Sequence, residues 1–133
     1  MSLLTSPPDG LRQIGWRRIV LTALAFCLAP ALVGAVALAA IMLSGRGSLQ
    51  AEGLATFALF SPLVGAPIWG AIAAGAAWLL RRGSFGWLPA ALLGGLVFGI
   101  LMRAGVSGIV LPVGAASALL YRMALALQRP EAI

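Results

Sequence analysis

The chain contains no His, no Lys and no Asn, and it has one Cys and three acidic residues among its 133 residues. Without His, it can neither hold a haem through an imidazole nor use a Ser-His or Cys-His pair for hydrolysis. One thiol without an imidazole is too few ligands for a zinc site, and a phosphate-binding G-x-x-x-x-G-K-[ST] loop lacks its Lys. The sequence therefore predicts a protein that is not an enzyme and that holds no metal or cofactor.

Charge is also scarce. Charged residues make up 9% of the chain and hydrophobic residues 62%, and the mean hydropathy is +1.06. A soluble domain is about half apolar and about a quarter charged, so this composition is incompatible with a water-soluble domain. It predicts an all-α integral membrane protein.

Four mostly apolar stretches are candidate transmembrane helices, because a helix needs about 20 mostly apolar residues to cross the hydrocarbon. They cover approximately residues 19–43, 54–80, 85–102 and 106–123. We predict four transmembrane helices packed as a bundle of two hairpins, within a single membrane domain spanning residues 1–133. The last two stretches are separated only by Arg103, Ala104 and Gly105. A re-entrant pair that dips into the membrane and returns on one side is therefore the competing interpretation.

The nine arginines are unevenly distributed across this predicted arrangement. Seven lie on the side that carries both termini: Arg12, Arg17, Arg18, Arg81, Arg82, Arg122 and Arg129. Only Arg46 and Arg103 fall on the opposite side. Because Arg-rich short loops resist translocation, both termini are predicted to be cytoplasmic. Residues 1–18 then form a cytoplasmic or interfacial segment, and residues 124–133 form a cytoplasmic tail.

Three aromatic residues agree with this topology. Trp16, Trp87 and Tyr121 lie at the predicted cytoplasmic boundary, where an amphipathic ring is favoured. The same topology accounts for the net charge of +6, so we do not interpret that charge as a nucleic-acid-binding surface. The cytoplasmic arginines are expected to attract the anionic head groups of the bilayer. We expect the protein in a plasma membrane, most simply the bacterial inner membrane.

Small residues recur at four-residue intervals in every predicted span, which places them along one face of each helix. The helix-packing candidates are Ala31, Ala35, Gly70, Ala74, Gly95, Gly99, Gly114 and Ala118. Such faces let helix backbones approach closely in a membrane, and packing within one chain is the simplest explanation for them. Because every span carries one, we expect some of these faces to contact other chains in a homo-oligomer or a larger membrane complex.

Prolines within the spans suggest a candidate solute cavity. Pro62 and Pro112 lie at a similar predicted depth below the outer surface, and each removes a backbone hydrogen bond from its helix. The freed carbonyls, together with Ser61, Ser107 and Arg103, would line an outward-facing cavity. A single Arg there favours a small anion or a neutral polar solute. Most prolines in membrane helices only bend them, so this cavity is the weaker hypothesis.

No acidic or imidazole side chain is predicted at membrane depth, where such groups usually mark ion pathways and proton relays. The chain is similar to the small multidrug exchangers in length and span count, but it lacks the membrane-embedded carboxylate that they need. The leading hypothesis is a non-catalytic membrane subunit or assembly protein that acts through small-residue helix packing. The alternative is a small oligomeric channel or carrier for a small anion or a neutral solute.

Overall fold

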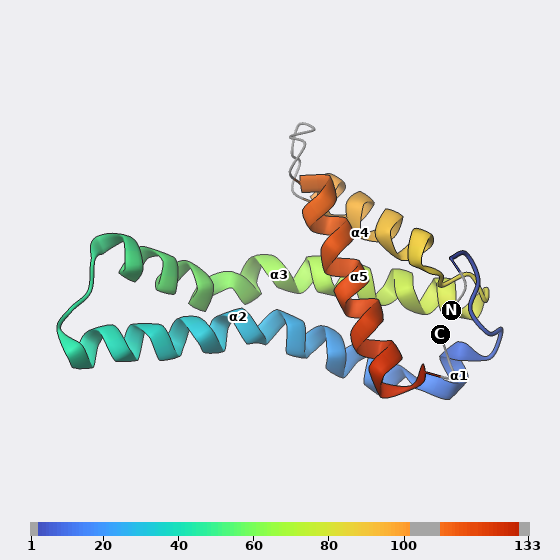
Figure 1. The fold of residues 1–133 in the computed structure, drawn as a ribbon, viewed down its shortest axis with the longest axis horizontal. Helices are drawn as coiled ribbons and strands as arrows, with labels where there is room; N and C mark the ends of the chain where they lie inside the picture. Colours follow the sequence, from blue (N-terminus) through green and yellow to red (C-terminus); the bar gives the residue numbers. More distant parts are fainter. Residues whose placement is uncertain (1–2, 102–109, 131–133) are drawn as a thin grey trace.

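The computed structural model describes residues 3–101 and 110–130, and within these ranges every regular element is a helix (Figure 1). The helices are α1 (Gly10–Ile14), α2 (Trp16–Ser44), α3 (Leu49–Arg81), α4 (Trp87–Leu101) and α5 (Val110–Gln128). The predicted all-helical class is therefore confirmed.

Glycines in the left-handed backbone region separate the first three helices. Gly15, at φ +78°, lies between α1 and α2, and Gly45, at φ +60°, ends α2 with its N–H donating to the Ile41 carbonyl. Glycine adopts this region without the steric cost that a Cβ brings. Ser48 then caps α3 by accepting a hydrogen bond from the Ala51 N–H. The short connection turns α3 back antiparallel to α2 (Figure 1).

The α2–α3 hairpin is held together by close backbone contact. At Gly34 on α2, an added Cβ would lie 2.5 Å from the Leu59 nitrogen and 2.6 Å from the Ala55 carbonyl oxygen. Nearer the chain termini, Ala23 and Cys27 on α2 are both buried. Small residues at the contact let membrane helices gain packing energy along their length.

The α4–α5 pair crosses one part of this hairpin. The backbones of α4 and α5 meet where a Cβ added at Gly94 would overlap the Gly114 carbonyl oxygen and lie 2.6 Å from the Cβ of Ala118. α4 and α5 pack mainly on each other, and against the hairpin α4 contacts α3 while α5 contacts α2. In Figure 1 the pair lies toward the end that carries both termini, and α5 crosses the hairpin obliquely. The hairpin around Gly45 extends beyond the pair.

The core lies at the end of the molecule where both termini meet the α3–α4 connection (Figure 1). Its buried residues are Ile14, Ile19, Ala23, Ile68, Ile72, Ala73, Ala76, Ala77, Leu80, Phe85, Ala90, Tyr121, Leu125 and Ala126. Beside it, the rings of Phe26, Trp69 and Tyr121 form a cluster with centroids 5.0 to 6.2 Å apart. The dispersion contacts of these side chains hold α1 and α5 against the hairpin.

Three helices are long and apolar enough to cross a membrane: α2, α3 and Leu111–Gln128 of α5. At a rise of about 1.5 Å per residue, the 29 residues of α2 extend about 43 Å and the 33 of α3 about 50 Å. Both exceed the hydrocarbon thickness of roughly 30 Å, whereas the 15 residues of α4 extend only about 22 Å. The three candidate membrane-spanning helices indicate a multi-pass helical membrane protein. The crossing of α4 and the bundle of two hairpins remain predictions.

Among the four predicted spans, the last one differs most in its bounds from the corresponding helix, α5. The predicted span over residues 106–123 stops beside Arg122, but α5 continues to Gln128. Arg122 is fully buried among protein groups, so its charge does not mark the end of the embedded helix. Pro112 is the third described residue of α5. α2 and α3 continue as helices through their internal prolines.

The boundary prediction expects the ring of Tyr121 among the lipid head groups. In the structure the ring is instead packed inside the protein. It is fully buried, and its hydroxyl donates a 2.7 Å hydrogen bond to the Ile19 carbonyl oxygen. Trp16, in contrast, is 60% exposed. The Tyr121 bond ties α5 to the first turn of α2.

Replacing Tyr121 with Phe is expected to lower the free energy of unfolding by about 1 kcal/mol, because it removes one buried hydrogen bond and preserves the ring packing. The measurement is unfolding of the purified protein in mixed micelles of increasing SDS content, followed by helical circular dichroism. Ser117→Ala is the control, because its hydroxyl bonds to the Val113 carbonyl within α5 at an exposed position. An equal loss in both variants would contradict a role for Tyr121 in joining the helices.

Candidate functional site

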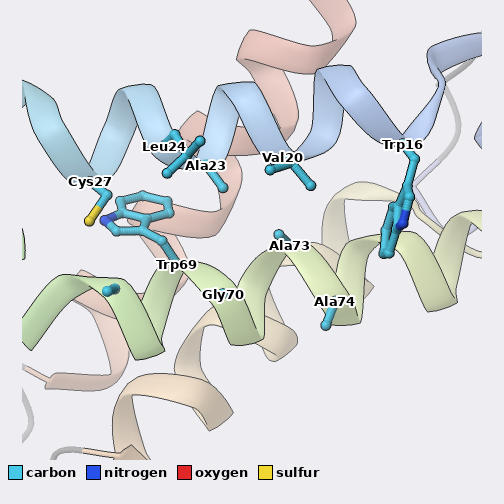
Figure 2. A pocket seen from close by; sticks show the side chains of 10 residues that line it. Trp16, Val20, Ala23, Leu24, Cys27, Trp69, Gly70, Ala73 and Ala74 are labelled. Atoms are coloured by element: carbon cyan, nitrogen blue, oxygen red, sulfur yellow. The ribbon is translucent and has the colours of Figure 1, made fainter.

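An apolar groove of about 350 Å³ lies between α2 and α3, in the half of the hairpin nearest the termini (Figure 2). It is lined by Trp16, Val20, Ala23, Leu24, Cys27, Ala66, Trp69, Gly70, Ala73 and Ala74. Figure 2 shows Trp16 toward one end and Trp69 toward the other. The short side chains between the two indoles leave the hollow open.

The α3 side of the groove is built from small residues at four-residue intervals. Ala66, Gly70 and Ala74 carry no side chain longer than a methyl group, and this spacing places them on one helix face. A Cβ added at Gly70 would meet no atom of the described chain within 4 Å. This face of α3 therefore has room that the described residues do not fill.

The groove continues toward the end of α3. An adjoining hollow is lined by Leu11, Trp16, Ala74, Ala77, Trp78 and Arg81. Trp16 and Ala74 line both hollows, so the two adjoin along α3, and together they are called the furrow below. Along α3 the furrow runs from Ala66 to Arg81, a rise of about 22 Å. It is apolar over most of this length, and the exposed Arg81 lies at its end.

Of four predicted packing residues, two line the groove and two pack against another helix of the same chain. Gly70 and Ala74 line the groove, where they are open to a neighbour. Gly114 and Ala118 instead pack against Gly94 of α4, within the same chain. The stripe on α5 is therefore used internally, whereas the stripe on α3 is free.

The other four predicted packing residues lie outside the groove. Ala31 is half-buried and Ala35 is exposed on α2. A Cβ added at Gly95 or at Gly99 would lie 3.7 Å from Leu111, which is an ordinary contact. The glycine of α4 that makes the closest contact is Gly94, which the four-residue spacing did not single out.

The predicted solute cavity is only partly covered by the structure, because Arg103 and Ser107 lie outside the described residues. Ser61, which precedes Pro62 in α3, lines a hollow with Phe57, Phe60, Leu63, Val64, Gly65, Ile68, Trp69 and Phe98. Pro112 lines a different hollow, between α4 and α5. The structure therefore does not bring Ser61 and Pro112 into one pocket, and the cavity remains a prediction.

Arg122 is the most unusual polar residue of the described chain. It is fully buried, its Nε donates a 3.1 Å hydrogen bond to the Phe85 carbonyl, and its guanidinium lies 4.3 Å from the centre of the Trp87 ring. Both terminal nitrogens of the guanidinium are buried, and neither has a hydrogen-bond partner among the residues that the structure describes. Each buried donor left without a partner costs about 1–3 kcal/mol, so this arrangement is expensive for the fold.

From the sequence, Arg122 is predicted only as one of the arginines on the cytoplasmic side. The signal that would have found it is its spacing, because Arg122 follows Gly114 and Ala118 at four-residue intervals on one helix face. Gly114 and Ala118 pack against α4, and Arg122 continues that face toward the α3–α4 connection. Because Arg122 lies on this packing face, its position indicates a buried side chain rather than a membrane boundary.

Ionisable side chains other than arginine are scarce in the described ranges. No group of three His, Cys, Asp or Glu residues within them is arranged to hold a metal ion, and no ion pair forms between two of their side chains. The groove presents apolar atoms almost exclusively. Comparison of the chain with models of protein families, with curated proteins and with solved structures finds no match.

Proposed function

We propose that the protein is a non-catalytic integral membrane subunit or assembly partner that receives a transmembrane helix of another chain in its α2–α3 groove. The observation that supports this most directly is the open α3 face at Gly70, between Trp16 and Trp69 (Figure 2). The occupying helix belongs to a second copy of this chain or to a larger complex.

The shape and chemistry of the furrow suit a helix. In a bilayer, lipid tails are as apolar as side chains, so association is driven by close packing where small residues let backbones approach. The furrow from Ala66 to Arg81 presents such residues over about four turns of helix. Trp16 and Trp69 add large, rigid contact surfaces at low entropic cost.

We also propose that α4 crosses the bacterial inner membrane together with α2, α3 and α5, and that both termini are cytoplasmic. The arginines support this arrangement. Arg12, Arg81 and Arg129 belong to the end of the molecule where both termini lie, whereas Arg46 belongs to the α2–α3 turn at the opposite end (Figure 1). This distribution follows the rule that short Arg-rich segments stay in the cytoplasm.

Gly70→Leu tests the docking proposal. The new side chain has space in the monomer, so the variant should fold, but it would fill the groove and exclude a partner helix. We expect the association constant of the complex to fall roughly tenfold or more, an effect of about 1.4 kcal/mol. The measurement is native mass spectrometry of tagged protein extracted from its own membrane in mild detergent.

Ala29→Leu is the matched control, because it adds a similar side chain at an exposed position of α2 outside the groove. The control should leave the complex intact. If Gly70→Leu retains the same complex as the control, or if the wild-type protein is monomeric in its native membrane extract, the docking proposal is wrong.

A further inference from the structure

We propose that Arg122 and the start of α4 form a binding site for a phosphate-class anion, either a phospholipid head group or inorganic phosphate, which the N-terminal segment 3–8 covers in this structure. This site is separate from the groove and does not depend on the proposed docking function. It follows from three observations: unfilled guanidinium donors on Arg122, unbalanced positive charge, and a covering segment whose oxygen atoms accept from the N–H groups of Phe85 and Leu88 at the start of α4.

The unfilled donors belong to the guanidinium of Arg122. Within residues 3–101 and 110–130, its Nε donates to the carbonyl of Phe85, while both terminal nitrogens are buried and find no acceptor. A guanidinium presents its donors in a planar fork that matches the oxygens of phosphate. An oxyanion is therefore the ligand class that would satisfy them.

The surrounding charge is positive and has no counter-ion within the described residues. The guanidinium lies over Trp87, the first residue of α4, and a helix N-terminus carries partial positive charge. A buried cation beside the positive end of a helix favours an anion on both counts.

The N-terminal segment covers this place and already supplies oxygen atoms to it. The Ser6 hydroxyl accepts from the Phe85 N–H at 3.2 Å, and the Leu3 carbonyl accepts from the Leu88 N–H at 3.1 Å. Leu3 and Leu4 are 73% and 57% exposed, so their side chains bury little apolar surface. An oxyanion that displaced the segment would offer acceptors to the two N–H groups and to the unfilled guanidinium donors.

Hydrogen exchange of the purified protein in detergent tests this proposal. The probes are sodium phosphate at constant ionic strength and short-chain phosphatidylglycerol, added separately. We expect anion binding to speed exchange in residues 3–8, which are displaced, while residues 85–88 stay protected. A response to phosphatidylglycerol alone identifies a head-group site, and a response to inorganic phosphate identifies a free-anion site. If neither probe changes exchange in residues 3–8, the proposal is wrong.

Two variants and a control sharpen the test. Arg122→Gln should weaken the anion response at least about tenfold, because it removes charge-assisted hydrogen bonds. Arg82→Gln is the matched control, since it removes an arginine that also stacks on a Trp nearby, and it should keep the response. Ser6→Ala leaves Arg122 intact and weakens the cover, so half-maximal response should need less anion. An equal response in wild-type protein and Arg122→Gln, or an unchanged midpoint in Ser6→Ala, would overturn the proposal.

Discussion

Replacing Gly94 with Ala is expected to separate α4 from α5 and to lower the free energy of unfolding by about 3 kcal/mol, the upper end of the usual cost of overpacking. The new Cβ would overlap the Gly114 carbonyl oxygen, and it would lie 2.6 Å from the Cβ of Ala118. The first of these obstacles is backbone, which cannot rotate aside as a long side chain can. The helices must therefore move apart, and the packing around Phe98 is lost with them.

Gly95, the next residue, provides the control, because an alanine there is expected to keep or raise the free energy of unfolding. A Cβ added at Gly95 would lie 3.7 Å from the Leu111 carbonyl oxygen, an ordinary van der Waals distance. Because Ala favours a helix over Gly by about 0.8–1 kcal/mol, Gly95→Ala should leave stability unchanged or raise it. SDS titration of both variants, followed by circular dichroism, measures the difference. Similar stability changes in the two variants would contradict the close crossing at Gly94.

The long helices could be predicted because the length of an uncharged, apolar stretch marks a transmembrane helix in the sequence. Uncharged stretches over 19–43 and 54–80 fall within α2 and α3, and turn-forming glycines such as Gly45 lie between them. The physics that produces this signal is local, since every residue in hydrocarbon must be apolar and every backbone group must be bonded within its helix. The same reasoning could not separate a crossing α4 from a re-entrant one, because its 15 residues fall between the two cases.

The candidate sites were harder to predict, because they depend on which face of each helix is used. The four-residue spacing that selects Gly95 and Gly99 applies to any helix face, whereas contact with α5 selects Gly94. Gly70 was identified by spacing, but only the arrangement of α2 and α3 shows that its face is open. Arg122 was assigned to a membrane boundary, because burial of a charge depends on distant neighbours such as Phe85.

The contacts of α5 restrict the topology to two cases. The Tyr121 hydroxyl bonds to the Ile19 carbonyl, and the Gln128 side chain bonds to the Thr22 hydroxyl at 3.0 Å. The end of α5 therefore lies beside the start of α2, and α4 begins near the same end (Figure 1). Since the α4–α5 pair starts and finishes on one side, either both helices cross the membrane or neither does.

Labelling of Arg103→Cys with a membrane-impermeant maleimide distinguishes these cases, in a Cys27→Ala background without other thiols. If both helices cross, position 103 should be labelled on intact cells as fully as Arg46→Cys, whereas Arg129→Cys should be labelled only after permeabilisation. We expect this outcome, because a re-entrant pair would hold Arg103 inside the membrane at a cost of about 2.5–3.5 kcal/mol. Thinning the bilayer to match the roughly 22 Å length of α4 costs only fractions of a kcal/mol per Å. Labelling at 103 that requires permeabilisation, or that fails even then, would instead show that α4 and α5 return to the side from which they entered.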